Sequence, residues 1–132
     1  MAKVNGAQSV EMIPGRKIVL SRGKGKTNVA ELQWLTNTVL QSAAAWKQTG
    51  WAYIADCSAM DPVGSAESTE LVKMTKKFVE AGCKAFGFAE GRSIMLKVQA
   101  QKNTERSNTG VAECHFATVE EVLAWLKTTV RI

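Results

Sequence analysis

Two kinds of hydrophobic pattern alternate along the chain: short, almost continuous apolar runs, and longer stretches in which apolar residues recur every three or four positions. Short runs bounded by turn residues are typical of strands, and the longer periodicity is typical of helices. The short runs predict strands at residues 8–13, 17–21, 51–56, 84–89 and 111–117. Because Pro14 and Gly15 form a turn signal, we expect the first two strands to make an antiparallel hairpin, preceded by a loose start at residues 1–7.

The longer stretches predict four helices. The first begins at Thr27 or Asn28, which are good N-cap residues, and runs to about residue 48. The second covers residues 65–81, and the last begins after Thr118, where two glutamates suit the positive end of the helix dipole. Residues 92–108 fit either a strand or a frayed helix by their pattern, and the alternation of the neighbouring elements favours a helix.

Two strands followed by alternating helices and strands predict an α/β fold with right-handed crossovers. We expect a single domain over residues 1–132, with a mostly parallel sheet of about five strands, an antiparallel N-terminal strand and about four helices. No stretch approaches the roughly 20 apolar residues of a membrane helix. The first residues also lack the apolar segment of a signal peptide, so the sequence favours the cytoplasm.

Charge and cysteine content exclude some classes of function. The 17 basic and 12 acidic residues give a net charge of +5, which permits an anionic partner, but no nucleic-acid recognition motif accompanies it. Cys57, Cys83 and Cys114 are odd in number and widely spaced, without a C-x-x-C pair. A disulfide framework or a zinc site is therefore disfavoured, and we expect the cysteines to pack as small hydrophobic residues.

The most informative stretch is WAYIADCSAMDPVGS, residues 51–65. Its apolar run predicts a buried strand that ends at Asp56, followed by a polar loop and by a helix that opens at Ser65. Open α/β sheets place their sites at the C-terminal ends of strands. We therefore predict a binding site here, with these candidate residues: Asp56, Ser58, Asp61, Gly64 and Ser65. The simpler interpretation is that Ser65 is only an N-cap and that Asp56 only accepts hydrogen bonds from loop amides.

Three parts of the chain carry a family resemblance: the hairpin before the first helix, residues 54–91 with their D-x-S loop, and FATVEEVLAWL at residues 116–126. Together they resemble the STAS domain, the anti-sigma-factor-antagonist fold, and most closely its SpoIIAA-like branch. The resemblance implies a regulatory module that acts by binding a protein partner or a small ligand, without a cofactor. It also implies helices gathered on one face of the sheet, which leaves the other face for a homodimer.

In regulatory members of this family a kinase phosphorylates a serine in a D-S-x-G or D-S-S-G segment. The matching segment here is Gly64-Ser65-Ala66-Glu67, in which Ser65 meets the first serine and Ala66 stands at the usual phosphoacceptor position. A hydroxyl at a helix start lies beside free backbone N–H groups, which favour an added phosphate. Ser65 is thus the candidate phosphorylation site, although the departures from the motif favour the simple cap.

The basic stretch SRGKGKT, residues 21–27, follows a strand and ends in Gly-Lys-Thr, as a phosphate-binding P-loop does. The first glycine of that motif would have to stand at position 20, which is Leu20. The alternative function is therefore a looser phosphate, anion or nucleotide site formed by this loop with Lys24, Lys26 and, after the fourth strand, Arg92. A solvated basic loop is the simpler interpretation.

The sequence offers no workable catalytic set. His115 is the only histidine, and Cys114 beside it points to the opposite face of the same strand. A Ser-His-Asp triad would need His115 near mid-strand, away from the usual loop sites. We therefore predict a protein that is not an enzyme and that uses no metal. Four tryptophans predict core packing, with a hydrophobic ligand pocket or a self-association surface as the alternative.

Overall fold

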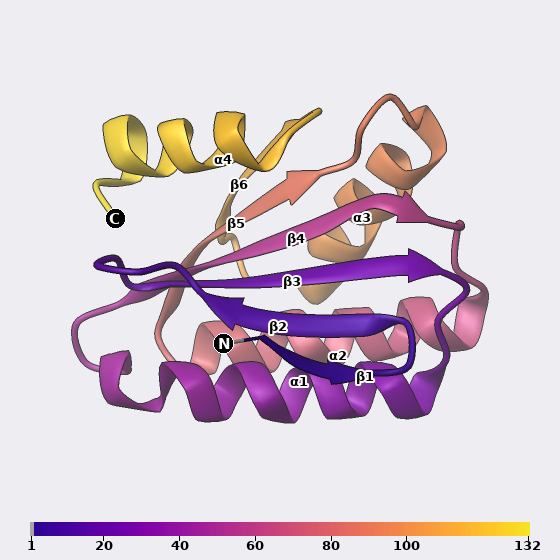
Figure 1. Ribbon diagram of the computed structural model, residues 1–132, viewed down its shortest axis with the longest axis horizontal. Coiled ribbons are helices and arrows are strands. Elements are labelled where there is room, and N and C mark those ends of the chain that lie inside the picture. Colours follow the sequence, from indigo (N-terminus) through magenta and orange to yellow (C-terminus); the bar gives the residue numbers. More distant parts are fainter. Residues whose placement is uncertain (1) are drawn as a thin grey trace.

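The computed structural model describes residues 2–132 and shows an α/β architecture built on one six-stranded sheet (Figure 1). The strands are β1 Lys3–Asn5, β2 Gln8–Met12, β3 Ile18–Gly25, β4 Trp51–Met60, β5 Cys83–Ala89 and β6 Ala112–Phe116. The helices are α1 Val29–Ala43, α2 Ser65–Glu80, α3 Ile94–Ser107 and α4 Val119–Trp125, with short continuations at Ala44–Trp46 and Leu126–Val130. Within the described residues, no helix has the length and apolar character needed to cross a bilayer.

The strands lie in the sheet in chain order, from β1 to β6. β1, β2 and β3 pair antiparallel, and β3 to β6 pair parallel, so the predicted α/β class and mostly parallel sheet are confirmed. Crossovers of one hand between sequential strands bring all the connecting helices to the same face. The helices α1, α2 and α3 cover this face, which we call the helical face. The last helix, α4, follows β6 and packs on the opposite face, which we call the α4 face.

The predicted elements are confirmed in type, including the helix at residues 92–108, but the ends of two strands were wrong and one strand, in the expected loose start at residues 1–7, was not predicted. Residues 3–5 form an edge strand paired with β2, and its exposed side chains, with Val4 as the single apolar residue, gave no apolar run. β3 continues through the residues expected to form a loop and ends at Gly25. It does so because the neighbouring strands extend beside it: Gly23 pairs with Gln8 of β2, and Gly25 pairs with Met60 of β4. β4 likewise continues past Asp56 to Met60.

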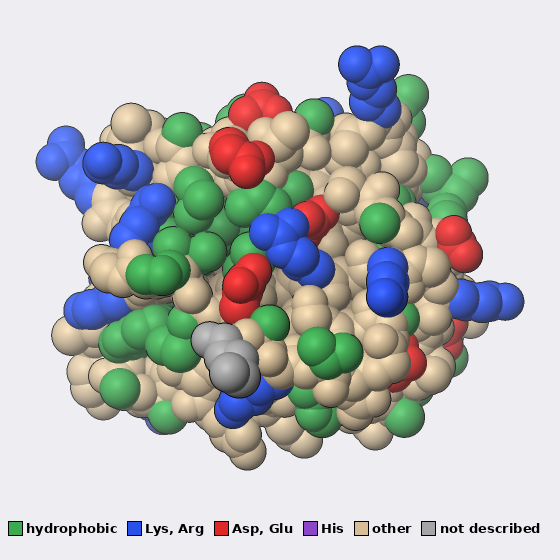
Figure 2. Space-filling view, in the orientation of Figure 1, with side chains coloured by type: hydrophobic (Ala, Val, Ile, Leu, Met, Phe, Trp, Pro, Cys, Tyr) green, Lys and Arg blue, Asp and Glu red, His purple; other side chains and the backbone are tan. Residues whose placement is uncertain are grey.

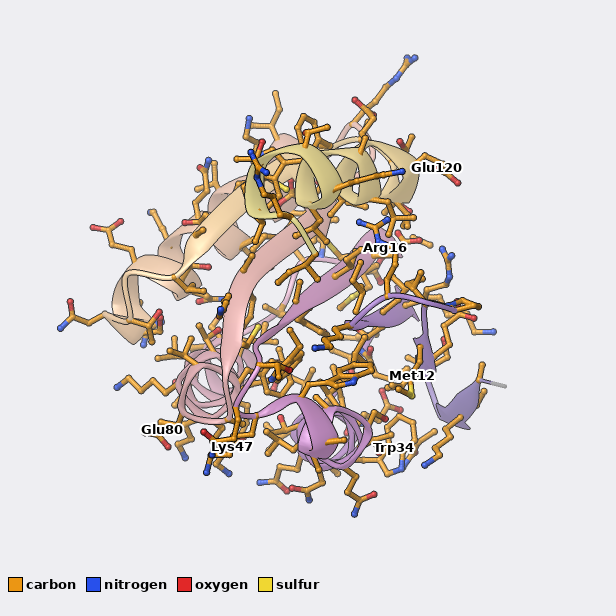
Figure 3. All side chains as sticks on the ribbon, turned by 90° about the vertical axis from the view of Figure 1, so that its left-hand side faces the viewer. Met12, Arg16, Trp34, Lys47, Glu80 and Glu120 are labelled. Atoms are coloured by element: carbon orange, nitrogen blue, oxygen red, sulfur yellow. The ribbon has the colours of Figure 1, made fainter. Side chains whose placement is uncertain are left out.

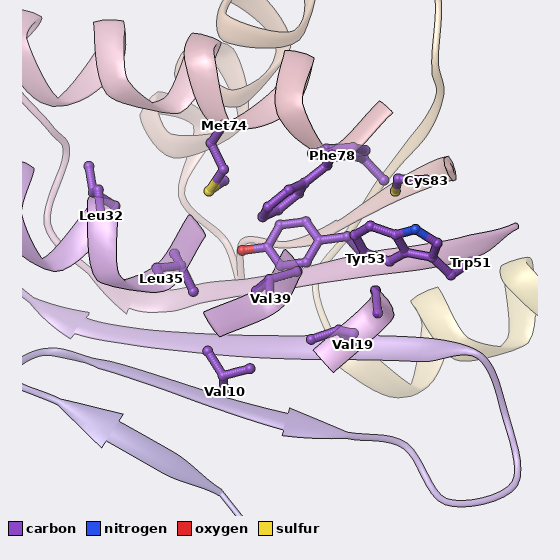
Figure 4. Close-up of a cluster of buried hydrophobic side chains, with 12 residues drawn as sticks. Val10, Val19, Leu32, Leu35, Val39, Trp51, Tyr53, Met74, Phe78 and Cys83 are labelled. Carbon is purple, nitrogen blue, oxygen red and sulfur yellow. The ribbon is translucent and has the colours of Figure 1, made fainter. Parts of the chain in front are cut away.

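An aromatic cluster forms the centre of the core on the helical face (Figure 4). Phe78 of α2 lies over Trp51 and Tyr53 of β4, with ring centroids 5.6 and 4.9 Å away, and Phe86 of β5 completes the group. The buried Trp51 indole donates a hydrogen bond to the backbone oxygen of Ala81. The predicted apolar stripe of α1 packs here too, through Leu32, Leu35, Val39, Ala43 and, partly buried, Trp46. The core role predicted for these tryptophans is therefore confirmed.

The α4 face is packed closely under a single helix. Val122 and Leu126 are fully buried there against Ile54 and Ala85. A Cβ on Gly87 would lie 2.1 Å from Cγ1 of Val122, so a glycine is required where the helix meets the sheet. Arg16, next to α4 in Figure 3, donates hydrogen bonds to the backbone oxygens of Leu123 and Ile132 and so ties the chain end to the β2–β3 turn.

Candidate functional site

A cavity of about 80 Å³ lies between the helical face and the three helices that cover it. Its apolar lining comes from Leu32 and Leu35 of α1, Leu71 and Met74 of α2, Leu96 and Ala100 of α3, Tyr53 and Met60 of β4, and Phe86 and Phe88 of β5. Met60 and Phe88 lie near the C-terminal ends of their parallel strands, the usual place for a ligand in an open α/β sheet, while Phe86 and Tyr53 lie further back along the strands. This apolar lining, rather than any charged motif, makes the cavity the candidate ligand site.

Most polar groups in the cavity wall already have partners inside the protein. The hydroxyl groups of Ser21 and Tyr53 hydrogen-bond to each other, and burial raises the pKa of Tyr53, so its phenol stays neutral. The Thr75 hydroxyl donates to the backbone oxygen of Leu71, 3.0 Å away. The buried Gln8 donates from Nε2 to the hydroxyl oxygen of Thr27 at 3.1 Å.

Two carboxamides of α3 also line the cavity, and they differ in their bonding. Gln99 accepts a hydrogen bond from the backbone N–H of Val63 at 3.1 Å and donates one to the Val63 oxygen at 3.0 Å. It thereby fastens the β4–α2 loop to α3. Asn103 is 7% exposed, and within residues 2–132 its side chain makes no hydrogen bond.

Asp56 and Ser58 are hydrogen-bonded to each other inside β4, so Ser58 does not lie in a loop as expected. The Asp56 carboxylate accepts hydrogen bonds from the Ser58 N–H at 3.2 Å and hydroxyl at 2.7 Å, which is the simpler role foreseen for it. It also pairs with Arg22, whose Nε lies 3.5 Å from Glu11. Figure 2 shows acidic and basic side chains next to one another over this part of the sheet. The charges therefore offset one another at the surface.

The other residues of the predicted β4–α2 site do not converge on one point. Asp61 is exposed in the connection, and its backbone N–H donates to the Gly25 oxygen at 2.9 Å. Gly64, not Ser65, is the N-cap of α2, so the prediction that Ser65 caps this helix was wrong. Glu67 reaches back to accept from the Gly64 N–H at 3.2 Å, which holds the cap at Gly64. Ser65 is exposed on the first turn.

The basic stretch is not a phosphate-binding loop. Arg22 and Lys24 lie in β3, and the Lys24 N–H donates to the backbone oxygen of Ala7 at 3.0 Å. A P-loop needs free amides that point at the phosphates, and the sheet uses these amides instead. Lys24 and Lys26 are exposed, and Arg92 borders a different hollow, after β5. The three cations predicted for the alternative anion site therefore have no common pocket among the described residues.

Sequence reasoning missed a cluster on the helical face in which the buried side chains of Glu90 and His115 meet the partly exposed Glu113. His115 was expected near mid-strand but is the penultimate residue of β6, and its ring stacks on Phe88 at a centroid distance of 4.9 Å. Its Nδ1 lies 2.8 Å from Glu90 and its Nε2 lies 2.9 Å from Glu113. Burial lowers the pKa of His115, but the hydrogen bonds to the two carboxylates outweigh it and raise the pKa overall. The i, i+2 spacing of Glu113 and His115, which places both side chains on the same face of a strand, was the sequence feature that could have indicated this cluster.

The three cysteines are free and behave as packing residues, as predicted. Burial raises the pKa of Cys57 and Cys83 to about 12 and that of Cys114 to about 11, so the thiols stay protonated. Cys114 and His115 do point to opposite faces: Cys114 packs in the α4-face core, while His115 stacks on the helical face. Among residues 2–132, no group of three His, Cys, Asp or Glu side chains is arranged to hold a metal ion.

Comparison with known proteins gives no family assignment. No protein-family model matches the chain, and no curated protein matches it either. The binding roles predicted for the residues above therefore stay predictions.

Proposed function

We propose that this chain is a non-enzymatic binding module of the STAS/SpoIIAA-like kind, whose ligand is a small molecule held in the cavity between the sheet and α1 to α3. The cavity is the observation that carries the proposal, because it is mostly apolar and concave and extends to the C-terminal ends of the parallel strands β4 and β5 at Met60 and Phe88. The order of the elements and the resembling segments at residues 54–91 and 116–126 support the family assignment. We expect the module to act in the cytoplasm, as a monomer or a homodimer.

The chemistry of the nucleophiles and bases supports binding without catalysis. The cysteine thiols have raised pKa values and stay protonated at neutral pH. Both ring nitrogens of His115 are occupied by carboxylates, so the ring is not free to take a proton from a substrate. The carboxylate of Asp56 is bound by Arg22 and Ser58.

The proposal is tested by titrating ¹⁵N-labelled protein with toluene and recording amide shifts by NMR. We expect saturable shifts at cavity residues such as Leu35, Met74 and Phe88. The variant Ala100→Leu fills the cavity from α3 and should abolish them, whereas Gln101→Leu adds the same side chain at the next, exposed position and should not. Absence of saturable shifts in the wild-type protein would refute the proposal, and so would undiminished binding in folded Ala100→Leu.

A protein partner is the other ligand class that the resemblance implies, and Ser65 is the candidate site of a phosphorylation that would regulate it. Intact-mass measurement of protein purified gently from its native cells separates the two. A mass increase of about 80 Da that Ser65→Ala removes would indicate a phosphorylated switch and a kinase partner. Under native conditions we expect instead an additional non-covalent mass that Ala100→Leu removes.

A further inference from the structure

The two carboxamides on α3 differ in a way that points to the ligand. Gln99 and Asn103 are four residues apart, so they lie on the same side of the helix, and both line the cavity. Gln99 uses its oxygen and its nitrogen together, on the adjacent N–H and C=O of Val63. Asn103 carries the same donor and acceptor, is nine-tenths buried, and has no partner within residues 2–132.

The unpaired carboxamide of Asn103 is open to the cavity rather than sealed in the core. Every fully enclosed polar side-chain atom among residues 2–132 has a hydrogen-bond partner, so the amide of Asn103 keeps some accessible surface. The hydroxyl of the adjacent Thr104 donates to the backbone oxygen of Ala100 at 3.1 Å and makes no hydrogen bond with Asn103. A ligand that covers Asn103 must therefore satisfy its donor and acceptor, and this makes Asn103 the group most able to select among ligands.

The charge of the cavity wall narrows the ligand class further. No lysine, arginine or histidine is among the lining residues of the described chain. Asp56 is paired with Arg22, and the groups at Tyr53 and Cys57 stay protonated because burial raises their pKa. An ion would therefore lose its hydration without gaining a counter-charge, so the cavity favours a neutral molecule. Phe86 and Phe88 supply contact surface for an apolar or aromatic body.

We propose that the cavity binds a small, neutral, ring-shaped molecule that carries an adjacent N–H and C=O, as a lactam or another cyclic amide does. The ligand N–H donates to Oδ1 of Asn103, and the ligand C=O accepts from Nδ2, in the pattern that Val63 makes with Gln99. The ring packs against the phenylalanines. This inference rests on the proposed function, because it specifies the ligand of the same cavity.

Three probes test the inference on the full chain: 2-pyridone, N-methyl-2-pyridone and toluene. The first offers the N–H and C=O edge, the second lacks the donor, and the third is purely apolar. Affinities come from NMR titration of the cavity amides. In the wild-type protein we expect 2-pyridone to bind about tenfold tighter than its N-methyl form, which corresponds to about 1.4 kcal/mol. This comparison needs no variant, so it is independent of any folding defect.

The variant Asn103→Leu then tests whether the preference for 2-pyridone comes from the Asn103 carboxamide. It should weaken 2-pyridone about tenfold and leave toluene equal or tighter, whereas the exposed control Gln101→Leu should change neither. Equal affinity of the wild-type protein for the two pyridones would overturn the inference, and so would an equal loss of affinity for toluene and 2-pyridone in Asn103→Leu. In either case, binding of toluene to the wild-type protein would still support the proposed function. If no probe, toluene included, shifts the cavity amides of the wild-type protein, the proposed function itself fails.

Discussion

The two faces of the sheet are built by the same strands but packed in different ways. On the α4 face, one helix lies so close to the sheet that Val122 meets the backbone at Gly87. On the helical face, three helices cover a larger area and leave a cavity beside the aromatic cluster. Tyr53 and Ile54 show the division within a single strand, since adjacent residues point to opposite faces.

The difference in packing between the two faces suits one face to stability and the other to binding. A filled face contributes dispersion contacts and apolar burial and has no space for a ligand. A face with a cavity gives up some of that packing and, here, keeps an unpaired amide at Asn103 and a charged cluster around His115. We infer that the α4 face stabilises the fold and that the helical face carries the function, and the following changes test that division.

The largest loss of stability is expected from Leu126→Ala on the α4 face. Leu126 is fully buried against the sheet, so the change removes contacts and leaves a cavity in a rigid surround. We expect the free energy of unfolding to fall by about 2–5 kcal/mol in urea denaturation. Ligand binding by the remaining folded protein should be unchanged. A loss well below this range would mean that α4 is only loosely attached.

The next largest effect is expected from His115→Gln, in the charged cluster of the helical face. The change removes charge-assisted hydrogen bonds to Glu90 and Glu113, which are worth about 1.5–3 kcal/mol. The pKa of His115 is raised in the folded protein, so its contribution is complete below the unfolded value of about 6.5 and is lost as pH rises through the folded pKa. Urea denaturation across a range of about pH 5.5–9 measures this loss.

The variant provides the control for that pH dependence. A glutamine side chain has no charge to titrate, so the decline in stability above about pH 6.5 should be absent from His115→Gln. A wild-type protein whose stability rises over the same interval would contradict a raised pKa for His115 between the two glutamates.

Matched additions of carbon to the two faces give the sharpest comparison. Gly87→Ala forces a Cβ against the stiff, buried Val122 and should cost about 1–3 kcal/mol. Ala100→Leu adds more atoms but places them in the cavity, so its melting temperature should stay the same or rise. The melting temperatures of both variants, measured by thermal denaturation, test this comparison. If Ala100→Leu is the more destabilised of the two, the cavity is not a space that a side chain can fill.

The fold was largely predictable because periodicity reports burial. The stripe from Leu32 to Ala43 and the run from Trp51 to Ile54 each matched one element, and Asn28 does cap α1 through its side chain. The strand ends were not predictable, because pairing with a neighbour extends β3 through glycines and lysines that are typical of loops. Residues 3–5 gave no signal, because an edge strand here buries none of its side chains.

The site was predicted less well, because sequence motifs emphasise charged and loop residues. Asp56 and Ser58 were both candidates and are hydrogen-bonded to each other, but the cavity is formed mainly by residues whose pattern indicates only a core, such as Phe86. Asn103 lies in a polar segment, and only the packing of α3 on α2 shows that it faces inward. His115 meets Glu90 because β5 and β6 are neighbours, which spacing alone does not indicate.

The smallest effect is expected from Ser65→Ala, at a position that belongs to neither face. Gly64 caps α2, and the carboxylate of Glu67 accepts the hydrogen bond from its N–H, so the Ser65 hydroxyl is not needed by the helix end. We expect a change within about 0.5 kcal/mol in urea denaturation. Asn28→Ala is the matched control, because Asn28 accepts from the Glu31 N–H at 2.9 Å and should cost about 1 kcal/mol. A loss at Ser65 as large as that at Asn28 would restore Ser65 as a cap and shift the start of α2 by one residue.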